Sequence, residues 1–264
     1  MEKELSLVEI KAIAYATLKH FSNFSNEYNI QFFLSNGTLL GAIKYGGFIP
    51  WDDDIDIFVP RADYERLMKL YVNDGRYKLF SREREPAYRF PFAKLCDQTT
   101  LKEEGNIDNG VQLGVDIDIF PLDVCTEHIL RPSVQRMIKI YQKGCILSKF
   151  ISSKGKQTYK RVLIDCCRIL GFEFFCKRLE RIVKQEISRG HDEYMGCLMW
   201  PIYGEREIVP AEVFAETVEV EFEGERFPAP VGYDTYLRSL YGDYEKDPPV
   251  EKQKSHHRYT AYRI

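Results

Sequence analysis

The stretch that decides the fold is Phe48-Ile49-Pro50-Trp51-Asp52-Asp53-Asp54-Ile55-Asp56-Ile57-Phe58-Val59, in which four aspartates fall within five positions. We expect a strand over residues 51 to 59. Because successive side chains of a strand point to opposite faces, Asp54 and Asp56 would share one face and the intervening isoleucines the other. Two carboxylates about 7 Å apart repel each other unless a cation, a basic partner or solvent offsets the repulsion. The pattern favours a Mg²⁺ or Mn²⁺ site, and a solvated acidic turn before a strand is the alternative.

A second acidic strand is expected over residues 114 to 120, in the run Gly114-Val115-Asp116-Ile117-Asp118-Ile119-Phe120-Pro121-Leu122-Asp123. Its alternation places Asp116 and Asp118 on one face. Beside the first strand, one of these two carboxylates would complete a three-carboxylate metal site, and the sequence leaves open which one. Asp123 is interpreted as a turn or cap residue after the proline.

A turn suited to phosphate precedes the first acidic strand. The run Ser35-Asn36-Gly37-Thr38 lies between a short strand expected at 31 to 34 and helical turns expected at 38 to 45. Backbone N–H groups in such a turn can approach phosphate oxygens closely. Gly37 and Thr38 are therefore candidate substrate-binding residues.

After Pro121 the strand signals become sparse and helical periodicity dominates. This change predicts an α+β fold, with a small mixed sheet flanked by helices and a largely helical middle and C-terminal region. We expect a catalytic core over residues 1–125 and, over 126–264, a helical region with a small hairpin and a tail that completes the site. The further expected helices cover 5–24 with Ser6 as a cap, 134–151, 156–188, 62–72 and 233–241, and the further strands cover 77–81, 90–96 and the hairpin 217–227.

Composition excludes several classes of protein. The 264 residues carry 37 Lys and Arg against 40 Asp and Glu, a net charge of −3 that is too balanced for wrapping nucleic acid. The 17 Tyr and 17 Phe argue against disorder. The N-terminal residues lack the apolar core of a signal peptide, and the most apolar later stretch, 162–176, contains charged residues. We therefore expect no transmembrane segment and a cytoplasmic location.

The seven cysteines are odd in number and form no CxxC pair. Reduced thiols in the core are the expected state. A zinc site that uses Cys166, Cys167 and Cys176 is the alternative, although vicinal cysteines without paired spacing give a weak signal.

The acidic motifs and their flanks resemble the signature of the LicD family. The resemblance rests on 39–44, 47–57 and 61–65, with 117–123 as a second acidic motif and a C-terminal pattern at 241–244, 248–249 and 256–257. It implies a nucleotidyltransferase-like fold, related to fukutin-type enzymes, that transfers a substituted phosphate from a CDP-linked donor to a sugar hydroxyl. The usual donor would be CDP-choline, and the acceptor a cell-envelope glycan such as teichoic acid, lipopolysaccharide or capsule. A lipid-linked acceptor would bring the protein to the inner face of the membrane.

The resemblance also implies which residues carry the chemistry. Asp54, Asp56 and Asp118 correspond to the carboxylates that bind a divalent metal in the wider fold. Asp116 departs from the family pattern, in which an apolar or aromatic residue is common. Asp118 would bind a second metal or accept the acceptor proton, and both roles need the same carboxylate geometry.

Basic and aromatic residues supply the remaining candidates. Lys44, Arg61 and Lys94 would neutralise donor phosphates, with surface ion pairs as the alternative. His257, in the His256-His257-Arg258 cluster, would cap the site, with a disordered basic tail as the alternative. The aromatic candidates for a quaternary-ammonium pocket, with core packing as the alternative, are Trp51, Tyr45, Trp200 and Tyr203.

Two other functions use the same residues. A true nucleotidyltransferase would attack the α-phosphorus of a nucleoside triphosphate and release pyrophosphate. A catalytically silent member would keep the fold for glycan or partner recognition. Product analysis separates the first from CDP-dependent transfer, and cation and nucleotide binding separates the second.

Overall fold

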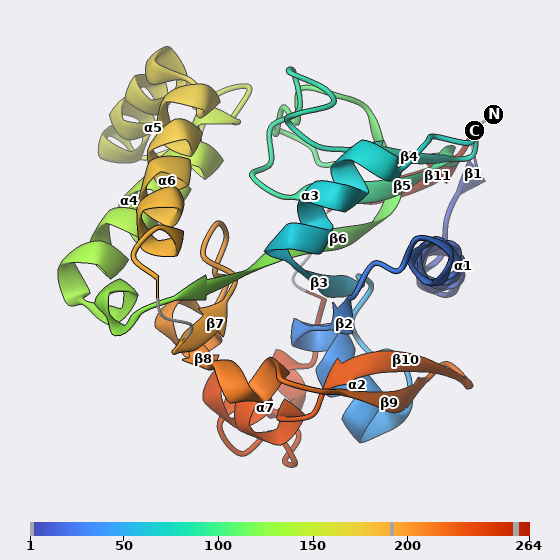
Figure 1. The fold of residues 1–264 in the computed structure, drawn as a ribbon. Helices are drawn as coiled ribbons and strands as arrows, with labels where there is room; N and C mark the ends of the chain where they lie inside the picture. The colour runs from blue at the N-terminus through green and yellow to red at the C-terminus, as the bar shows by residue number, and fades with distance from the viewer. Residues whose placement is uncertain (1–2, 191–192, 256–258) are drawn as a thin grey trace.

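The computed structural model describes residues 3–190, 193–255 and 259–264, and it confirms the α+β class (Figure 1). Among these residues, nine strands form one mixed sheet with the order β1-β11-β5-β6-β3-β2, extended by β4 on β5, β7 on β6 and β8 on β7. The strands are β1 (Lys3–Glu4), β2 (Phe33–Leu34), β3 (Asp56–Pro60), β4 (Tyr77–Phe80), β5 (Ala93–Glu103), β6 (Leu113–Cys125), β7 (Tyr194–Gly196), β8 (Val209–Pro210) and β11 (Thr260–Arg263).

The centre of the sheet is the long strand β6. It pairs in parallel with β3, which places Asp56 opposite Asp118, and antiparallel with β5, which places Lys94 opposite Asp118. Between these polar positions, β3 and β6 bury isoleucine and phenylalanine side chains in the main hydrophobic core. The register therefore aligns three charged residues across three neighbouring strands.

Helices α1 (Leu7–Tyr28), α2 (Asn36–Tyr45) and α3 (Arg61–Leu70) pack against this sheet. The predicted cap of the first helix is confirmed, because the Ser6 hydroxyl accepts a hydrogen bond from the backbone N–H of Glu9 and the Glu9 carboxylate accepts one from Ser6. The apolar stripe of α1 faces the sheet, as its period of three and four residues predicts.

A second hydrophobic cluster holds α4 (Pro132–Ser148), α5 (Thr158–Leu170) and α6 (Phe172–Ile187) together. The single long helical segment expected over 156–188 is in fact two helices, because Gly171 adopts a φ of 77° and ends α5. Figure 1 shows these three helices grouped on one side of the molecule, at the far end of β6 from the termini. β6 ends at Cys125, and strands from both sides of this residue belong to the same sheet.

The chain then returns to the sheet. After β7 and β8 it forms the hairpin β9 (Thr217–Phe222) and β10 (Glu225–Pro230), then α7 (Tyr233–Tyr241), and its last strand β11 pairs with both β1 and β5. Short 3₁₀ helices connect these elements at Glu127–Leu130, Gly204–Glu207, Ala211–Phe214 and Val250–Lys252. Residues distant in sequence thus complete the edge of the N-terminal sheet.

Three expected strand boundaries are wrong. β3 begins at Asp56 instead of residue 51, because a turn in which Asp52 N–H donates to Ile49 O precedes it. β6 continues through Pro121. The pairing of β6 with β5 stops at Ile119, opposite Ala93, and its pairing with β7 starts at Asp123, opposite Gly196, so the proline lies between the two pairings. β5 runs on to Glu103 by means of an irregularity in its pairing with β6 after Asp97.

The cysteines are all free thiols, and six of the seven are buried as expected. Cys166 is the exception, because it is exposed on α5. Within the described residues no cysteine belongs to a cluster of three or more potential metal ligands, so the zinc alternative has no geometric support. None of the described helices has the length and apolar character needed to cross a membrane.

Candidate active site

The acidic segment is the loop 48–54, which other elements fix in place before β3 begins. Lys11 on α1 donates hydrogen bonds to the carbonyl oxygens of Ile49 and Pro50, each over 3.1 Å. The backbone N–H of Phe48 donates to Glu223 from the hairpin, over 3.1 Å. Gly41 is required beneath this loop, since a Cβ there would lie 2.4 Å from the carbonyl oxygen of Gly47.

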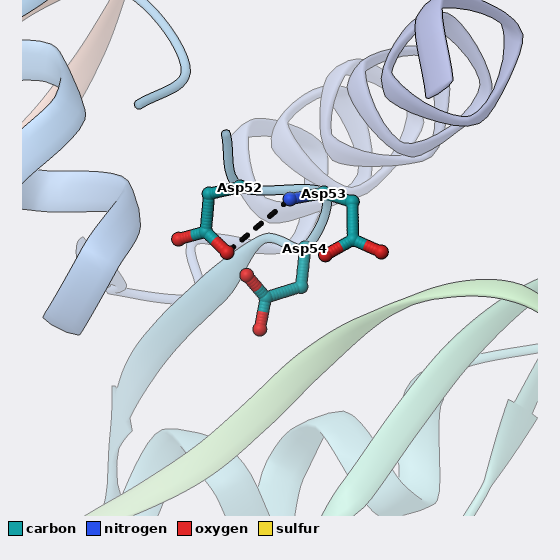
Figure 2. Close-up of side chains that lie close together, drawn as sticks. All are labelled: Asp52, Asp53 and Asp54. Atoms are coloured by element: carbon teal, nitrogen blue, oxygen red, sulfur yellow. Dashed lines mark hydrogen bonds between the residues drawn. The ribbon is translucent and has the colours of Figure 1, made fainter. Parts of the chain in front are cut away.

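Figure 2 shows how the loop presents its three consecutive aspartates, with the carboxylates of Asp52 and Asp53 turned to opposite sides and Asp54 between them. Ligand oxygens of the three lie within 4.8 Å of one another. The Asp53 carboxylate accepts a hydrogen bond from the Ser255 hydroxyl over 2.9 Å, so the C-terminal segment contacts this loop directly. The carboxylate of Asp52 lies over the start of α2, where a Cβ on Gly37 would be 2.8 Å from it.

One cavity of about 710 Å³ lies along the aligned charged residues, and we call it the acidic cavity. Asp54 and Asp56 both line it, although only Asp56 belongs to a strand. Asp116 and Asp118 enter it from β6, on one face of the strand as predicted. Its charged lining consists of Asp54, Asp56, Asp116, Asp118, Lys94, Lys102 and Glu104.

The two candidates on β6 have different partners. Asp116 accepts from Lys102 over 3.1 Å and from Lys94 over 3.4 Å, whereas Asp118 forms a close ion pair with Lys94 alone. Burial disfavours the charge of Asp116, yet the two ammonium groups hold its pKa below the ordinary value. Both aspartates are therefore paired with lysine, and Asp118, which lies opposite Asp56 in the sheet, has the fewer cationic partners.

Repulsion concentrates on Asp56. Burial and the nearby carboxylates of Asp54 and Asp118 raise its pKa well above the ordinary value. Burial also raises the pKa of Asp118, although Lys94 opposes the shift. A divalent cation would relieve this repulsion, and carboxylate oxygens are the ligands that Mg²⁺ and Mn²⁺ prefer. The carboxylates of this cavity are ligands of the right chemistry, whereas the three carboxylates whose oxygens lie within 4.8 Å of one another among the described residues are Asp52, Asp53 and Asp54.

A second cavity, of about 800 Å³, lies on the other side of the acidic segment, and we call it the aromatic cavity. Tyr45 and Trp51 meet edge to face with ring centroids 6.3 Å apart, and Tyr203 and Tyr241 do so at 5.1 Å. Asp52 supplies a carboxylate to its wall. Two perpendicular ring pairs provide π faces of the kind that attract an organic cation. The charged lining is mixed, with acidic side chains at Asp52, Asp243, Asp247 and Glu251 and basic ones at Lys44, Lys246, Lys252 and Lys254.

Comparison with known proteins supports an assignment. A model described as LicD/FKTN/FKRP, nucleotidyltransferase domain, matches residues 29–151. Lipopolysaccharide cholinephosphotransferase LicD of Haemophilus influenzae is 31% identical over 269 residues, which cover 98% of this chain and 99% of that protein. The chain belongs to the LicD family.

More distant relatives match only parts of the chain. An uncharacterized protein of Rickettsia typhi is 37% identical over 62 residues, which cover 23% of this chain. The mannosyltransferase regulator 4 of Saccharomyces cerevisiae is 28% identical over 111 residues, which cover 42% of this chain but 9% of that protein. The full-length match to the Haemophilus protein therefore carries the family assignment.

The two cavities of this LicD-family chain receive most of the residues expected from sequence. Lys94 lines the acidic cavity and is almost fully buried, at 4% exposure, instead of open to solvent. Gly37, Lys44 and Trp51 line the aromatic cavity, where Lys44 pairs with Asp247 over 2.6 Å.

Two expected residues, Thr38 and Arg61, lie elsewhere. Thr38 is buried, and its hydroxyl accepts a hydrogen bond from the backbone N–H of Asp56 over 2.8 Å, so it anchors the start of β3. Arg61 lines neither cavity and pairs with Asp123 through two bonds of 2.7 and 2.9 Å. Asp123 is fully buried, which corrects its interpretation as a turn residue. His257 lies outside the described residues.

Sequence reasoning missed Lys102 and Tyr241. Lys102 follows the irregular pairing of β5, so a strand expected to end at residue 96 could not place it beside Asp116. Tyr241 belongs to the C-terminal pattern that resembles the family, which was the available signal for a role. Of the four aromatic candidates, Trp200 lies in the acidic cavity instead of the aromatic one.

We predict that Arg61→Ala lowers the free energy of unfolding by about 3–5 kcal/mol, because it leaves the buried Asp123 carboxylate without its ion-pair partner. Urea denaturation followed by circular dichroism measures the change. Lys177→Ala, which removes the exposed pair with Glu173, is the control and should cost less than about 1 kcal/mol. Equal effects of the two substitutions would contradict a structural role for Arg61.

A second prediction concerns Glu207, which positions the aromatic cavity by accepting a hydrogen bond from the backbone N–H of Tyr203 over 2.5 Å. Burial raises its pKa from 4.5 to about 8. The folded protein therefore holds a proton that the unfolded chain has lost between these pH values. Stability should fall as pH rises through this window, by up to about 1.4 kcal/mol per pH unit.

Glu207→Gln should flatten this dependence, as thermal and urea unfolding between pH 5 and 9 would show. Glu205→Gln, at an exposed neighbouring position, should leave the slope unchanged. A wild-type slope that survives in Glu207→Gln would assign the pH dependence to another group.

Proposed function

We propose that this protein transfers a substituted phosphate, specifically phosphocholine, from a CDP-linked donor to a sugar hydroxyl of a cell-envelope glycan and releases CMP. The observation that carries the proposal is the arrangement of Asp54, Asp56 and Asp118 on one cavity, adjacent to a second cavity lined by aromatic rings. The name of the Haemophilus relative, a lipopolysaccharide cholinephosphotransferase, supports the same class of reaction.

In this mechanism the acidic cavity holds the donor diphosphate. Lys94 and Lys102 provide positive charge beside it, and Asp54, Asp56 and Asp118 would hold Mg²⁺ or Mn²⁺. The cation, when bound, would offset the charge that develops on the departing CMP. Cations on both sides of the diphosphate would thus stabilise the leaving group.

Transfer requires an attack by the acceptor oxygen on the distal phosphorus. The new oxygen–phosphorus bond forms, the bond to the CMP oxygen breaks, and the hydroxyl proton passes to a carboxylate. Asp118 would accept it where Asp54 and Asp56 hold the cation without it, because burial raises the pKa of an uncoordinated Asp118 although Lys94 opposes the shift. Its place opposite Asp56 keeps it within the acidic cavity.

The aromatic cavity supports choline as the donor alcohol. A trimethylammonium group has no hydrogen-bond donors, so ring faces and a nearby carboxylate recognise it better than polar side chains do. Trp51 directly precedes Asp52 in sequence, and its ring packs edge to face against Tyr45. The aromatic cavity therefore adjoins the acidic segment. A donor that spans both cavities would place its phosphates beside the carboxylates.

We predict that Asp56→Asn and Asp118→Asn each reduce transfer by at least about 1,000-fold, because each removes a carboxylate from the reaction centre. Phosphorus NMR with CDP-choline, Mg²⁺ and a purified glycan acceptor measures CMP and phosphocholine product. Because Asp56 is a strained buried charge, its replacement should leave the melting temperature equal or higher.

Asp53→Asn is the matched control and should be milder, since its carboxylate is held by Ser255 on the other side of the loop. An equal loss of transfer in Asp53→Asn and Asp56→Asn would contradict the assignment of Asp54, Asp56 and Asp118 as the reactive carboxylates. Release of pyrophosphate from a nucleoside triphosphate would instead identify a nucleotidyltransferase. Absence of cation-dependent binding of any cytidine diphosphate compound would indicate a silent member.

The donor alcohol is tested at Trp51. We predict that Trp51→Ala lowers kcat/KM for CDP-choline by about 2- to 30-fold, the range of one cation–π contact. It should lower kcat/KM for CDP-ethanolamine less, since that ammonium group also forms hydrogen bonds. Trp51→Phe keeps an aromatic face and should restore part of the preference. A uniform loss for both donors would indicate that Trp51 only supports the loop.

A further inference from the structure

Helix α5 exposes a continuous apolar stripe. Its side chains recur at intervals of three and four residues, so they share one face over roughly 16 Å of helix. The exposed fractions are 67% for Tyr159, 58% for Val162, 43% for Leu163, 85% for Ile169 and 49% for Leu170, and Cys166 is exposed at the centre of the same face.

The stripe is not the face that holds α5 to the rest of the protein. Only Ile164 and Cys167 of this helix are buried. In α6, by contrast, the apolar positions such as Phe175, Leu179 and Val183 are directed into the core. A surface helix ordinarily buries its apolar stripe and exposes its polar face. In α5 most of the apolar surface faces solvent, which marks an interaction surface.

The charge around the stripe is strongly positive. Residues 154–170 contain five basic side chains and a single acidic one, Asp165, in a chain whose net charge is −3. The acidic side chain lies within 3.3 Å of Arg168. The basic residues, all exposed, are Lys154, Lys156, Lys160, Arg161 and Arg168.

We propose that α5 binds the surface of a membrane that contains anionic lipid, with its apolar stripe in the headgroup layer and its basic residues against lipid phosphates. An apolar face opposite a polar face that carries Lys and Arg is the composition that interfacial helices use. The proposal deepens the proposed function, because an acceptor glycan carried on a lipid is reached at such a surface. The helix itself acts independently of the chemistry in the two cavities.

Charge favours an anionic membrane as the occupant. Arg161 and Arg168 lie on the exposed side of α5 away from the stripe, and Lys154 and Lys156 lie just before the helix. An anionic lipid surface attracts the same residues, at about fivefold in affinity per basic side chain.

Cys166 provides a direct probe, because it is exposed in the stripe while the other six cysteines are buried. The full-length protein labelled at Cys166 with an environment-sensitive fluorophore is titrated with vesicles of phosphatidylcholine containing 30% phosphatidylglycerol. We expect a blue shift and brighter emission, quenching by lipid-borne quenchers, and at least tenfold weaker binding to pure phosphatidylcholine. An emission that vesicles do not change would overturn the proposal.

Unlabelled variants test the stripe and its charges by vesicle sedimentation. Ile169→Glu and the double change Lys160→Glu with Arg161→Glu should each weaken binding at least tenfold. Val8→Glu, at a helical position 77% exposed on α1, is the matched control and should bind like the unmodified protein. Equal binding by Ile169→Glu, or a dimer in solution that Ile169→Glu dissociates, would reject the membrane in favour of another occupant.

The outcome is separable from that for the proposed function. Vesicle binding is measured without donor or acceptor, and turnover is measured with a delipidated, water-soluble glycan. Ile169→Glu should retain full turnover of the soluble acceptor while it loses vesicle binding. Vesicle binding without any transfer would leave this inference intact and reject the proposed function.

Discussion

The structure depends on a row of like and unlike charges held side by side by backbone pairing. Asp56, Asp118 and Lys94 occupy matching positions on three adjacent strands, and the hydrogen bonds of the sheet fix their spacing. Two of these groups repel, and burial amplifies the repulsion. The apolar residues between them, above all the isoleucines of β3 and β6, stabilise the sheet enough to retain this unfavourable arrangement. The core beneath this row therefore maintains a buried cluster of carboxylates on the acidic cavity.

Other elements adapt to the charged row. The lysines on β5 pair with both aspartates of β6, with Asp116 through two ammonium groups and with Asp118 through one. The loop before β3 directs Asp52 and Asp54 to different cavities, so one short segment separates two environments. One environment is lined by carboxylates and lysines, and the other by aromatic rings together with charges of both signs. This separation gives a physical basis for binding a donor with two chemically different ends.

Much of this organisation was predictable from the sequence, because alternation fixes which side chains share a strand face. On that basis the placement of Asp116 and Asp118 on one face of β6 is confirmed. The Ser6 cap and the α+β class are confirmed as well, from the capping pattern and from the change to helical periodicity. Alternation has no meaning where a segment is not a strand, so it could not place Asp54, which lies in a loop. Nor does local sequence report a partner 62 residues away, which is why Arg61 was expected at phosphate instead of at Asp123. The position of Lys102 depended on an irregular pairing that no local pattern reveals.

The late strand β11 has a consequence for how the protein matures. It lies between β1 and β5, and the nearby Ser255 contacts Asp53 in the acidic loop. During synthesis this segment emerges after every other part of the sheet. A nascent chain can bury most of its core before then, but its acidic loop lacks a supporting contact. The sheet edge and the contact that holds Asp53 thus both depend on the same C-terminal stretch, which emerges after the rest of the sheet.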